Sequence, residues 1–312
     1  MPTNSLKSDH LQRVLLNDGK VRGQYVHLEA TLNEVFMRRE YPEALMPILA
    51  ELATVSVMIA AGLKRGSLIV QIQGEGALRL MVVEVNVALQ VRATAEWSHE
   101  LHVGAPLQDW VGPGAKCVIT LDPQQPNSKM YQGIVPADQS TVAKMLEGYL
   151  ENSAQSPTRV WLGSDGRAGA GLLLQKLPAD SGRTYDESLI ESQELFWDQS
   201  IALADTVTSD ELIKLSGHEL LWRLFSSEGE VRVLTPQPVS FFCSCNEERV
   251  LHTLQMLGQE DVKNLFEEQD GEISIDCQFC GKHYVIGEHH FENLFSPEDN
   301  LNVKLDASNV QH

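Results

Sequence analysis

The chain of 312 residues is long enough for two domains, and its 43% hydrophobic content can build a substantial core. Its formal net charge is −19, so its overall field would repel a polyanion such as DNA or an anionic membrane surface. We therefore expect neither nucleic acid nor a membrane as a partner.

The N-terminal sequence and the apolar stretches bear on where the protein acts. Lys7 and Arg13 fall within residues 1–18, which lack the apolar run of a secretory signal. The longest apolar stretch, residues 44–63, contains Glu51 and predicts a buried amphipathic helix rather than a membrane span. We expect a cytoplasmic protein, in which thiols stay reduced and a cysteine cluster marks metal or redox chemistry.

Residues 1–178 are expected to form an α+β domain. Helical patterns cover residues 42–64 and 141–152. Short runs rich in Val, Ile and Leu predict strands at 21–29, 67–73, 77–85, 87–93, 116–121, 159–163 and 171–177. Several of these strands follow one another without an intervening helix. This order favours antiparallel pairing in a sandwich-like domain over a doubly wound parallel sheet.

A helical, acidic linker is predicted over residues 179–232. It contains twelve acidic residues against four basic ones, a net charge of −8. Helical stretches at 186–205 and 209–226 carry apolar residues at helical spacing. Because short helices are marginal alone, this apolar stripe should lie on a neighbouring domain, from which it could be released at low cost. An ordinary helical subdomain fits the pattern about equally well.

Residues 233–312 are predicted to form a small third domain with a polar tail from residue 298. Strand-like runs lie at 239–243, 273–275 and 284–286, and helical patterns lie at 247–257 and 261–268. A domain of about sixty residues has too few apolar side chains to be stable comfortably, since small cores supply only a few kcal/mol.

Four of the five cysteines lie in this last domain, in the patterns C-x-C and C-x-x-C. Four thiolates can hold Zn²⁺ tetrahedrally, and a C-x-x-C knuckle followed by glycine lets both sulfurs face one ion. C-x-C is less usual, but it can present two sulfurs if the backbone turns between them. We therefore predict one zinc ion per chain, with the ligands Cys243, Cys245, Cys277 and Cys280.

The metal should decide whether this domain folds. Structural zinc contributes roughly 10–16 kcal/mol of apparent binding energy at neutral pH. That is comparable with the whole stability of an ordinary domain, about 5–15 kcal/mol. Loss of the metal is therefore expected to unfold the domain.

The same thiolates are potential nucleophiles toward peroxide or hypochlorous acid, and two neighbouring thiols can trap a sulfenic acid as a disulfide. The close pairs along the chain are Cys243 with Cys245 and Cys277 with Cys280. A disulfide across one intervening residue closes a strained ring, and strained disulfides are the labile, regulatory kind. Oxidation would then release zinc, and reduction with zinc would reverse the change.

The other cysteine and the nearby histidines are interpreted as structural. Cys117 lies on an apolar run and is expected to be a buried core thiol. His283, His289 and His290 could replace a sulfur, but four cysteines suffice, so we assign them to the surface or the framework.

These motifs resemble the redox-regulated heat-shock chaperone family known as the thirty-three-kilodalton heat-shock protein. The C-x-C and C-x-x-C pairs at this separation match the family's zinc motif, one cysteine to each motif position. Further matching segments lie at 22–24, 73–80, 131–135, 169–178, 220–225 and 236–239. The resemblance covers about residues 20–296.

The resemblance implies a bacterial cytoplasmic holdase that is not an enzyme and is inactive while reduced and zinc-bound. Oxidation with mild unfolding would form the disulfides Cys243–Cys245 and Cys277–Cys280, expel zinc and free the helical linker. The active form is expected to be a homodimer that holds unfolding client proteins without ATP and passes them to ATP-dependent foldases. Both the linker stripe and the sheet of the first domain are candidate client surfaces.

Two other functions fit a cluster of four thiols. A zinc ribbon that binds nucleic acid would need a basic face, whereas acidic residues surround this site. A zinc-containing thiol–disulfide oxidoreductase would place its C-x-x-C at the start of a helix beside a βαβ unit, whereas Cys277 follows a strand-like run. We find no P-loop, no Ser/His/Asp arrangement and no persuasive carboxylate pair, so no catalytic residues are predicted.

Overall fold

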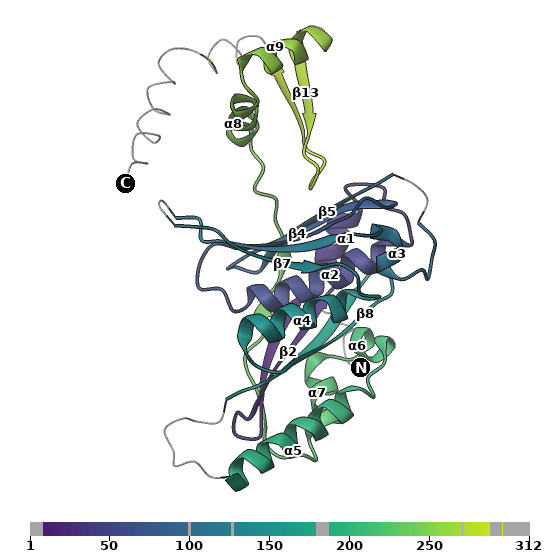
Figure 1. Ribbon diagram of the computed structural model, residues 1–312, viewed down its shortest axis with the longest axis vertical. Helices are drawn as coiled ribbons and strands as arrows, with labels where there is room; N and C mark the ends of the chain where they lie inside the picture. The colour runs from purple at the N-terminus through teal and green to yellow at the C-terminus, as the bar shows by residue number, and fades with distance from the viewer. Residues whose placement is uncertain are drawn as a thin grey trace, which may run out of the picture. The chain divides into compact units, whose positions relative to one another are not determined.

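The computed structural model describes residues 9–98, 101–125, 128–178, 187–269, 271–287 and 295. The chain divides into two compact units, Met1–Phe242 and Cys243–His312 (Figure 1). The sequence places a domain boundary at 232/233, and the structure places its unit boundary at 242/243. The first residues of the predicted linker, 179–186, and the predicted tail from residue 298 lie outside the described residues.

The first unit combines helices and strands in the α+β class that the sequence predicts. Its helices are α1 (Ala30–Phe36), α2 (Leu45–Ala60), α3 (Leu107–Val111), α4 (Val142–Ala154), α5 (Glu187–Ala204), α6 (Ser209–Lys214) and α7 (Gly217–Phe225). Its strands are β1 (His10–Leu16), β2 (Val21–Leu28), β3 (Ser67–Gln73), β4 (Leu78–Asn86), β5 (Gln90–Trp97), β6 (Lys116–Asp122), β7 (Tyr131–Pro136), β8 (Thr158–Ser164), β9 (Gly169–Lys176), β10 (Val231–Val233), β11 (Gln237–Pro238) and β12 (Ser240–Phe241).

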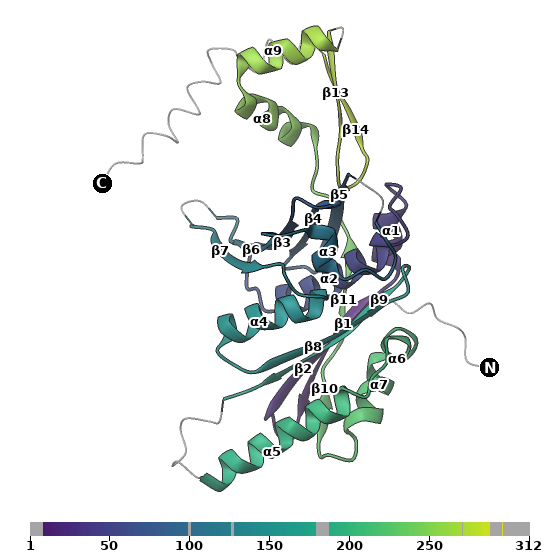
Figure 2. The same cartoon turned by 45° about the vertical axis from the view of Figure 1, so that its right-hand side comes forward.

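The strands form two sheets on either side of α2. The first sheet has the order β10-β1-β2-β9-β8, with β11 also beside β1, and the second has the order β12-β5-β4-β3-β6-β7. Apart from the short parallel pair of β12 with β5, the described strand pairs are antiparallel, as predicted. Helix α2 packs against β2, β8 and β9 of one sheet and β3, β4 and β5 of the other (Figure 2).

The sandwiched position of α2 explains why its sequence is so apolar. Most of its side chains are buried, including Thr54 and Ser56. The hydroxyls of these two residues donate to the main-chain oxygens of Ala50 and Leu52 at 2.8 and 2.7 Å, so neither is left without a partner. No helix in the described part of the chain is long and apolar enough to cross a bilayer.

Strand β1 has no counterpart among the predicted elements. Leu11 points into the main core beside α2, whereas Val14 and Leu16 lie in a second core on the opposite face of the same sheet. A strand covered on both faces loses the alternation of apolar and polar residues that marks an exposed strand. The strand predicted at 87–93 is also shifted, because Leu89 has a left-handed φ of 55° and belongs to the turn before β5.

Helices α5, α6 and α7 cover the outer face of the first sheet (Figure 2). Their apolar side chains pack on those of β1, β2 and β9 in the second core, which we call the helix-covered core. It comprises Val14, Leu16, Val21, Tyr25, Ala170, Leu172 and Leu174 of the sheet, and Phe196, Trp197, Ala204, Leu212, Leu220, Leu221 and Phe225 of the helices. The apolar stripe predicted for residues 179–232 is thus buried within the first unit.

Tyr25 fixes the helices to the sheet by hydrogen bonds as well as by packing. Its side chain is fully buried, and its hydroxyl lies 2.8 Å from the main-chain oxygen of Leu212 and 3.1 Å from that of Leu215. A Cβ on Gly217 would come within 2.5 Å of the Tyr25 ring, so only glycine allows α7 to begin this close to β2. These contacts join residues far apart in the chain.

The second unit is small. It contains α8 (Glu247–Leu257), α9 (Gln259–Glu268) and the hairpin of β13 (Glu272–Asp276) and β14 (His283–Gly287). Asn246 caps the start of α8, and its side chain accepts from the Arg249 backbone N–H at 2.8 Å. The buried apolar cluster of this unit comprises Leu254, Val262, Phe266, Ile273 and Ile286. A core of this size supplies only a few kcal/mol.

Candidate metal centre

The C-x-x-C pair lies on the turn of the β13–β14 hairpin. The Gly281 N–H donates to the oxygen of Cys277 at 2.8 Å, and the Cys277 N–H donates to the oxygen of Lys282 at 3.0 Å. Gly281 has a left-handed φ of 67°, which glycine adopts without strain. The glycine after the motif therefore lets the chain reverse while both sulfurs stay on one side.

The C-x-C pair precedes α8. Cys243 and Cys245 flank Ser244, whose hydroxyl accepts a hydrogen bond from the guanidinium of Arg249. Because Arg249 lies in the first turn of α8, this bond ties the C-x-C segment to the helix that follows it.

The structure brings the four sulfurs together. Every pair lies within 4.8 Å, and all four residues are half-buried. The sulfurs of Cys243 and Cys277 are 3.7 Å apart, and those of Cys245 and Cys280 are 3.3 Å apart. Four thiolates at the usual zinc–sulfur distance would be about 3.8 Å from one another. The cluster could therefore hold a metal ion.

The donor set consists of thiols alone. His283 hydrogen-bonds Asp276 through Nδ1 at 2.7 Å and is not part of the cluster, while His289 and His290 lie outside the described residues. Soft sulfur ligands suit Zn²⁺ and disfavour hard cations such as Mg²⁺ or Ca²⁺.

Tyr284 on β14 contacts the cluster. Its hydroxyl donates to the Sγ of Cys245 at 3.2 Å. Burial alone would raise the pKa of Cys245, but hydrogen bonds from Tyr284 and the neighbouring cysteines outweigh it and lower the pKa to about 7. Burial and the neighbouring thiols raise the pKa of Cys280 instead. Of these two thiols, Cys245 is the one that gives up its proton more readily.

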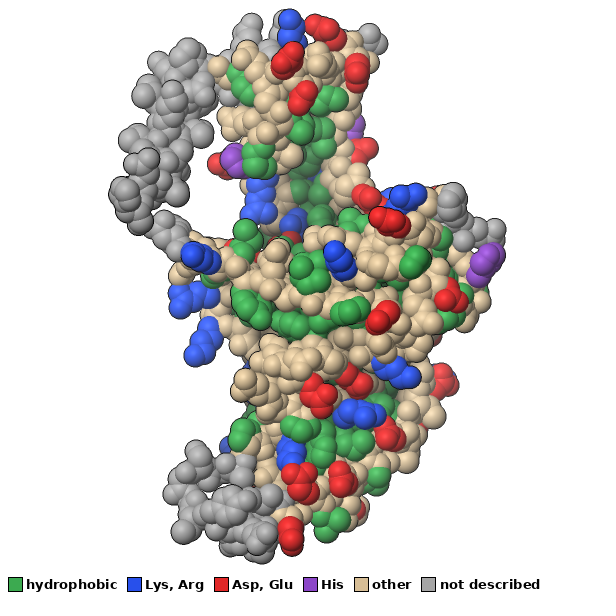
Figure 3. Space-filling view, in the orientation of Figure 1, with side chains coloured by type: hydrophobic (Ala, Val, Ile, Leu, Met, Phe, Trp, Pro, Cys, Tyr) green, Lys and Arg blue, Asp and Glu red, His purple; other side chains and the backbone are tan. Residues whose placement is uncertain are grey.

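The described part of the second unit carries more acidic than basic side chains, while Arg249 and Lys282 lie beside the cysteine motifs. Acidic side chains are prominent around α9 on the face seen in Figure 3. The described acidic residues of the second unit are Glu247, Glu248, Glu260, Asp261, Glu267, Glu268, Glu272 and Asp276. This charge opposes the binding of a polyanion.

Cys117 lies far from the four clustered cysteines in the sequence, and its thiol differs from theirs in reactivity. It is fully buried on β6 in the first unit, as predicted, and burial raises its pKa to about 12. A thiol in this setting is inert.

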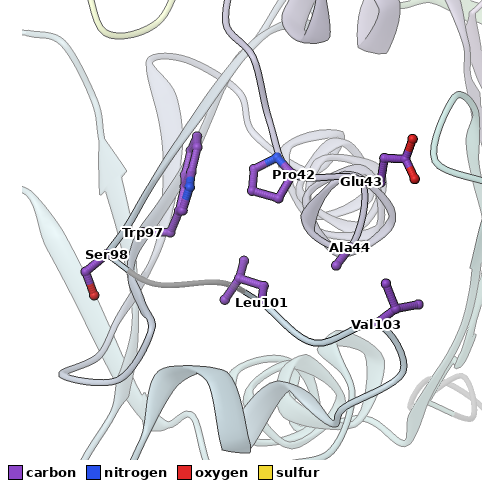
Figure 4. Close-up of a pocket in the computed structure, with 7 residues that line it drawn as sticks. All are labelled: Pro42, Glu43, Ala44, Trp97, Ser98, Leu101 and Val103. Carbon is purple, nitrogen blue, oxygen red and sulfur yellow. The ribbon is translucent and has the colours of Figure 1, made fainter.

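The first unit also contains a surface cavity of about 480 Å³. Figure 4 shows Trp97 and Pro42 on facing sides of it, with the Glu43 carboxylate pointing away. Its complete lining is Pro42, Glu43, Ala44, Trp97, Ser98, Leu101 and Val103.

Comparison with known proteins identifies the family. A family model described as Hsp33 protein matches residues 9–287. The 33 kDa chaperonin of Methylobacillus flagellatus is 39% identical over 307 residues, covering 98% of this chain and 99% of its own. The 33 kDa chaperonin of Chromobacterium violaceum is 41% identical over 288 residues, covering 92% of this chain and 94% of its own.

A solved structure shares the fold. The crystal structure of the 33 kDa chaperonin (heat shock protein 33 homolog) from Thermotoga maritima superposes with a TM-score of 0.75 at 18% identity. It covers 96% of this chain and 99% of its own. The family match and these relatives span both units, including the four-cysteine cluster, so the chain belongs to the Hsp33 family of chaperones.

Proposed function

We propose that this protein is a redox-regulated, ATP-independent holdase of the bacterial cytoplasm, inactive while reduced and active after oxidation. The observation that carries the proposal is the gathering of four thiols within 4.8 Å in a chain of a chaperone family. Its clients would be unfolding proteins, which it keeps from aggregating and later passes to ATP-dependent foldases. The active form is expected to be a homodimer.

In the reduced state, Cys243, Cys245, Cys277 and Cys280 would hold one zinc ion. The all-sulfur donor set supports this assignment. Zinc would supply a rigid cross-link between the C-x-C segment and the hairpin turn, which the small core of this unit cannot provide alone.

In the oxidised state, the same residues would form the disulfides Cys243–Cys245 and Cys277–Cys280. The formation of each disulfide takes two electrons from a pair of thiolates. Hypochlorous acid accepts these electrons and is reduced to chloride and hydroxide. Sulfurs joined in disulfides can no longer act as thiolate ligands, so the second unit would lose its metal and unfold.

The distances between the sulfur atoms bear directly on which cysteines would form disulfides. The two short sulfur contacts join different motifs, Cys243 with Cys277 and Cys245 with Cys280. Oxidation without rearrangement would favour those cross-motif bonds, whereas oxidation coupled to unfolding favours the pairs close in sequence. We expect mass spectrometry of disulfide-linked peptides to find bonds within each motif, and cross-motif bonds would contradict the proposed pairing.

We further propose that activation releases α5, α6 and α7, the segment 179–232 acting as a linker. Their departure would expose the sheet side of the helix-covered core, a continuous apolar surface on β1, β2 and β9. Contiguous exposed apolar surface marks protein-binding sites. Both this surface and the released helices would then be available to an unfolding client.

The proposal is tested by comparing reduced and oxidised protein. The reduced form should carry one zinc per chain and fail to suppress aggregation of a heat-unfolded client. Hypochlorous acid should release the zinc and turn suppression on, and a thiol reductant with zinc should turn it off. Equal suppression in both states would refute the switch. Retained zinc with catalytic reduction of insulin would favour the oxidoreductase alternative.

Gly163 allows a mutational test of the helix release. A Cβ at this position on β8 would lie 2.4 Å from the Oγ and 2.9 Å from the Cα of Ser209 at the start of α6. We expect Gly163→Ala to push α6 away and cost about 1–3 kcal/mol. The reduced protein should then suppress aggregation in part, with faster hydrogen exchange in α6.

Gly148 provides the matched control. A Cβ there meets nothing within 4 Å, and the residue lies in α4. Gly148→Ala should stabilise the helix by up to about 1 kcal/mol and leave the reduced protein inactive. If both glycine variants are inactive when reduced, docking of α6 does not restrain the chaperone.

A further inference from the structure

Tyr284 holds a defined position beside the cysteine cluster. Its side chain is 6% exposed, and it lies on β14 opposite Ile275 of β13. The Nζ of Lys282 lies 4.8 Å from the centre of its ring. With the ring fixed by burial and by this cation, the hydroxyl donates to the Sγ of Cys245 at 3.2 Å.

A hydrogen bond to a thiolate changes its chemistry. The donated proton draws electron density from the sulfur and makes it a weaker nucleophile. It also occupies one side of the sulfur, which an oxidant must approach to react. The hydroxyl has one proton to donate, and Cys245 accepts it, so we assign the effect to this one of the four proposed ligands.

We propose that the Tyr284 hydroxyl slows the reaction of Cys245 with oxidants and so raises the oxidant concentration at which the chaperone is activated. This inference rests on the proposed function of the cluster as a zinc and disulfide switch. The ammonium group of Lys282 lies over the Tyr284 ring and helps to hold that ring in place.

The reaction that Tyr284 restrains is a two-electron oxidation. With hydrogen peroxide, the Cys245 thiolate attacks one oxygen, the O–O bond breaks, and hydroxide leaves as a sulfenic acid forms. A neighbouring thiolate then attacks the sulfur and displaces a second hydroxide, which leaves the disulfide. In total, two thiolates and one peroxide give one disulfide and two hydroxide ions. The phenol proton of Tyr284 is not consumed.

The test uses Tyr284→Phe in the full chain, reduced and loaded with zinc. This change removes the hydroxyl and keeps the buried ring. Peroxide is the preferred oxidant because its slow reaction leaves differences in rate visible. Differential alkylation with mass spectrometry follows each cysteine, and a chromogenic chelator follows zinc release. We expect Cys245 to be oxidised several-fold faster than in the wild type, because the sulfur that no longer accepts this bond is the better nucleophile.

Tyr131→Phe is the matched control, because Tyr131 is 57% exposed on β7 in the first unit. In this variant, Cys245 should be oxidised at the wild-type rate. Replacing Tyr284 by 3-fluorotyrosine, a stronger hydrogen-bond donor, should slow the oxidation of Cys245 below that of the wild type. This second variant tests the same bond without removing any group.

Two results would overturn the inference. One is an unchanged or lower rate for Cys245 in Tyr284→Phe. The other is loss of zinc before any oxidant is added, which would give Tyr284 a purely structural role. The proposed function fails on different results, namely wild-type protein that carries no zinc or shows no activation by oxidant. The two failures can therefore be told apart.

Discussion

Removing the proposed metal ligands is expected to unfold the second unit and leave the first unit folded. In the variant with Cys277→Ser and Cys280→Ser, stoichiometric zinc binding should be lost. The small apolar cluster of this unit supplies only a few kcal/mol, whereas a structural zinc contributes roughly 10–16 kcal/mol. Hydrogen exchange should show loss of protection in α8, α9 and the β13–β14 hairpin, with protection retained in α2.

Cys117→Ala is the control for this experiment. It removes the buried thiol of the first unit, which burial makes inert, and should retain one zinc per chain. Stoichiometric zinc in the double serine variant would show that the ligand assignment is wrong. Full protection of α8 and α9 without zinc would show that this unit does not depend on its metal.

The second large effect concerns Glu51 and pH. This carboxyl is the one charged group on α2, and burial raises its pKa from 4.5 to about 7. Because the folded protein holds the proton more tightly, the free energy of unfolding is highest below pH 4.5 and falls as the pH rises toward 7. For the wild type, this amounts to a loss of about 2–3 kcal/mol in the free energy of unfolding between pH 5 and pH 8. Glu51→Gln should abolish this loss.

Glu51 lines a cavity of about 280 Å³ between α2, α4, β8 and α6. The charged groups that share this cavity are Lys144, Glu147 and Arg159, and α6 contributes Ser209 and Leu212. Ionisation of Glu51 therefore places a charge under α6. The same cavity lies where we propose that the helices detach.

Urea unfolding of the reduced, zinc-loaded protein at pH 5 and pH 8 measures this effect. Glu43→Gln is the control, since Glu43 is an exposed carboxylate just before α2, and its pH dependence should match that of the wild type. If Glu51→Gln also keeps the wild-type pH dependence, Glu51 does not hold its proton in the folded state.

Much of the first unit could be predicted because its elements obey local rules. Strand β3 and helix α4 coincide with the predicted patterns closely, since apolar spacing and turn residues mark their ends. Strand β1 was missed because both of its faces are covered, which removes the alternation on which strand prediction depends. Helix α1 was missed because seven residues give too short a periodic signal, and the Asp9 carboxylate that accepts from its first backbone N–H groups comes from a distant position.

The sequence by itself determined the cysteine motif, the α+β class and the family resemblance. These depend on the spacing of residues near one another, which the chain carries whatever its fold. Only the tertiary structure decided which face α5, α6 and α7 cover, that Glu51 lines a cavity with residues of α6, and that Tyr284 reaches Cys245. Each of these contacts joins residues far apart in the chain, and its energy depends on burial that no local pattern records.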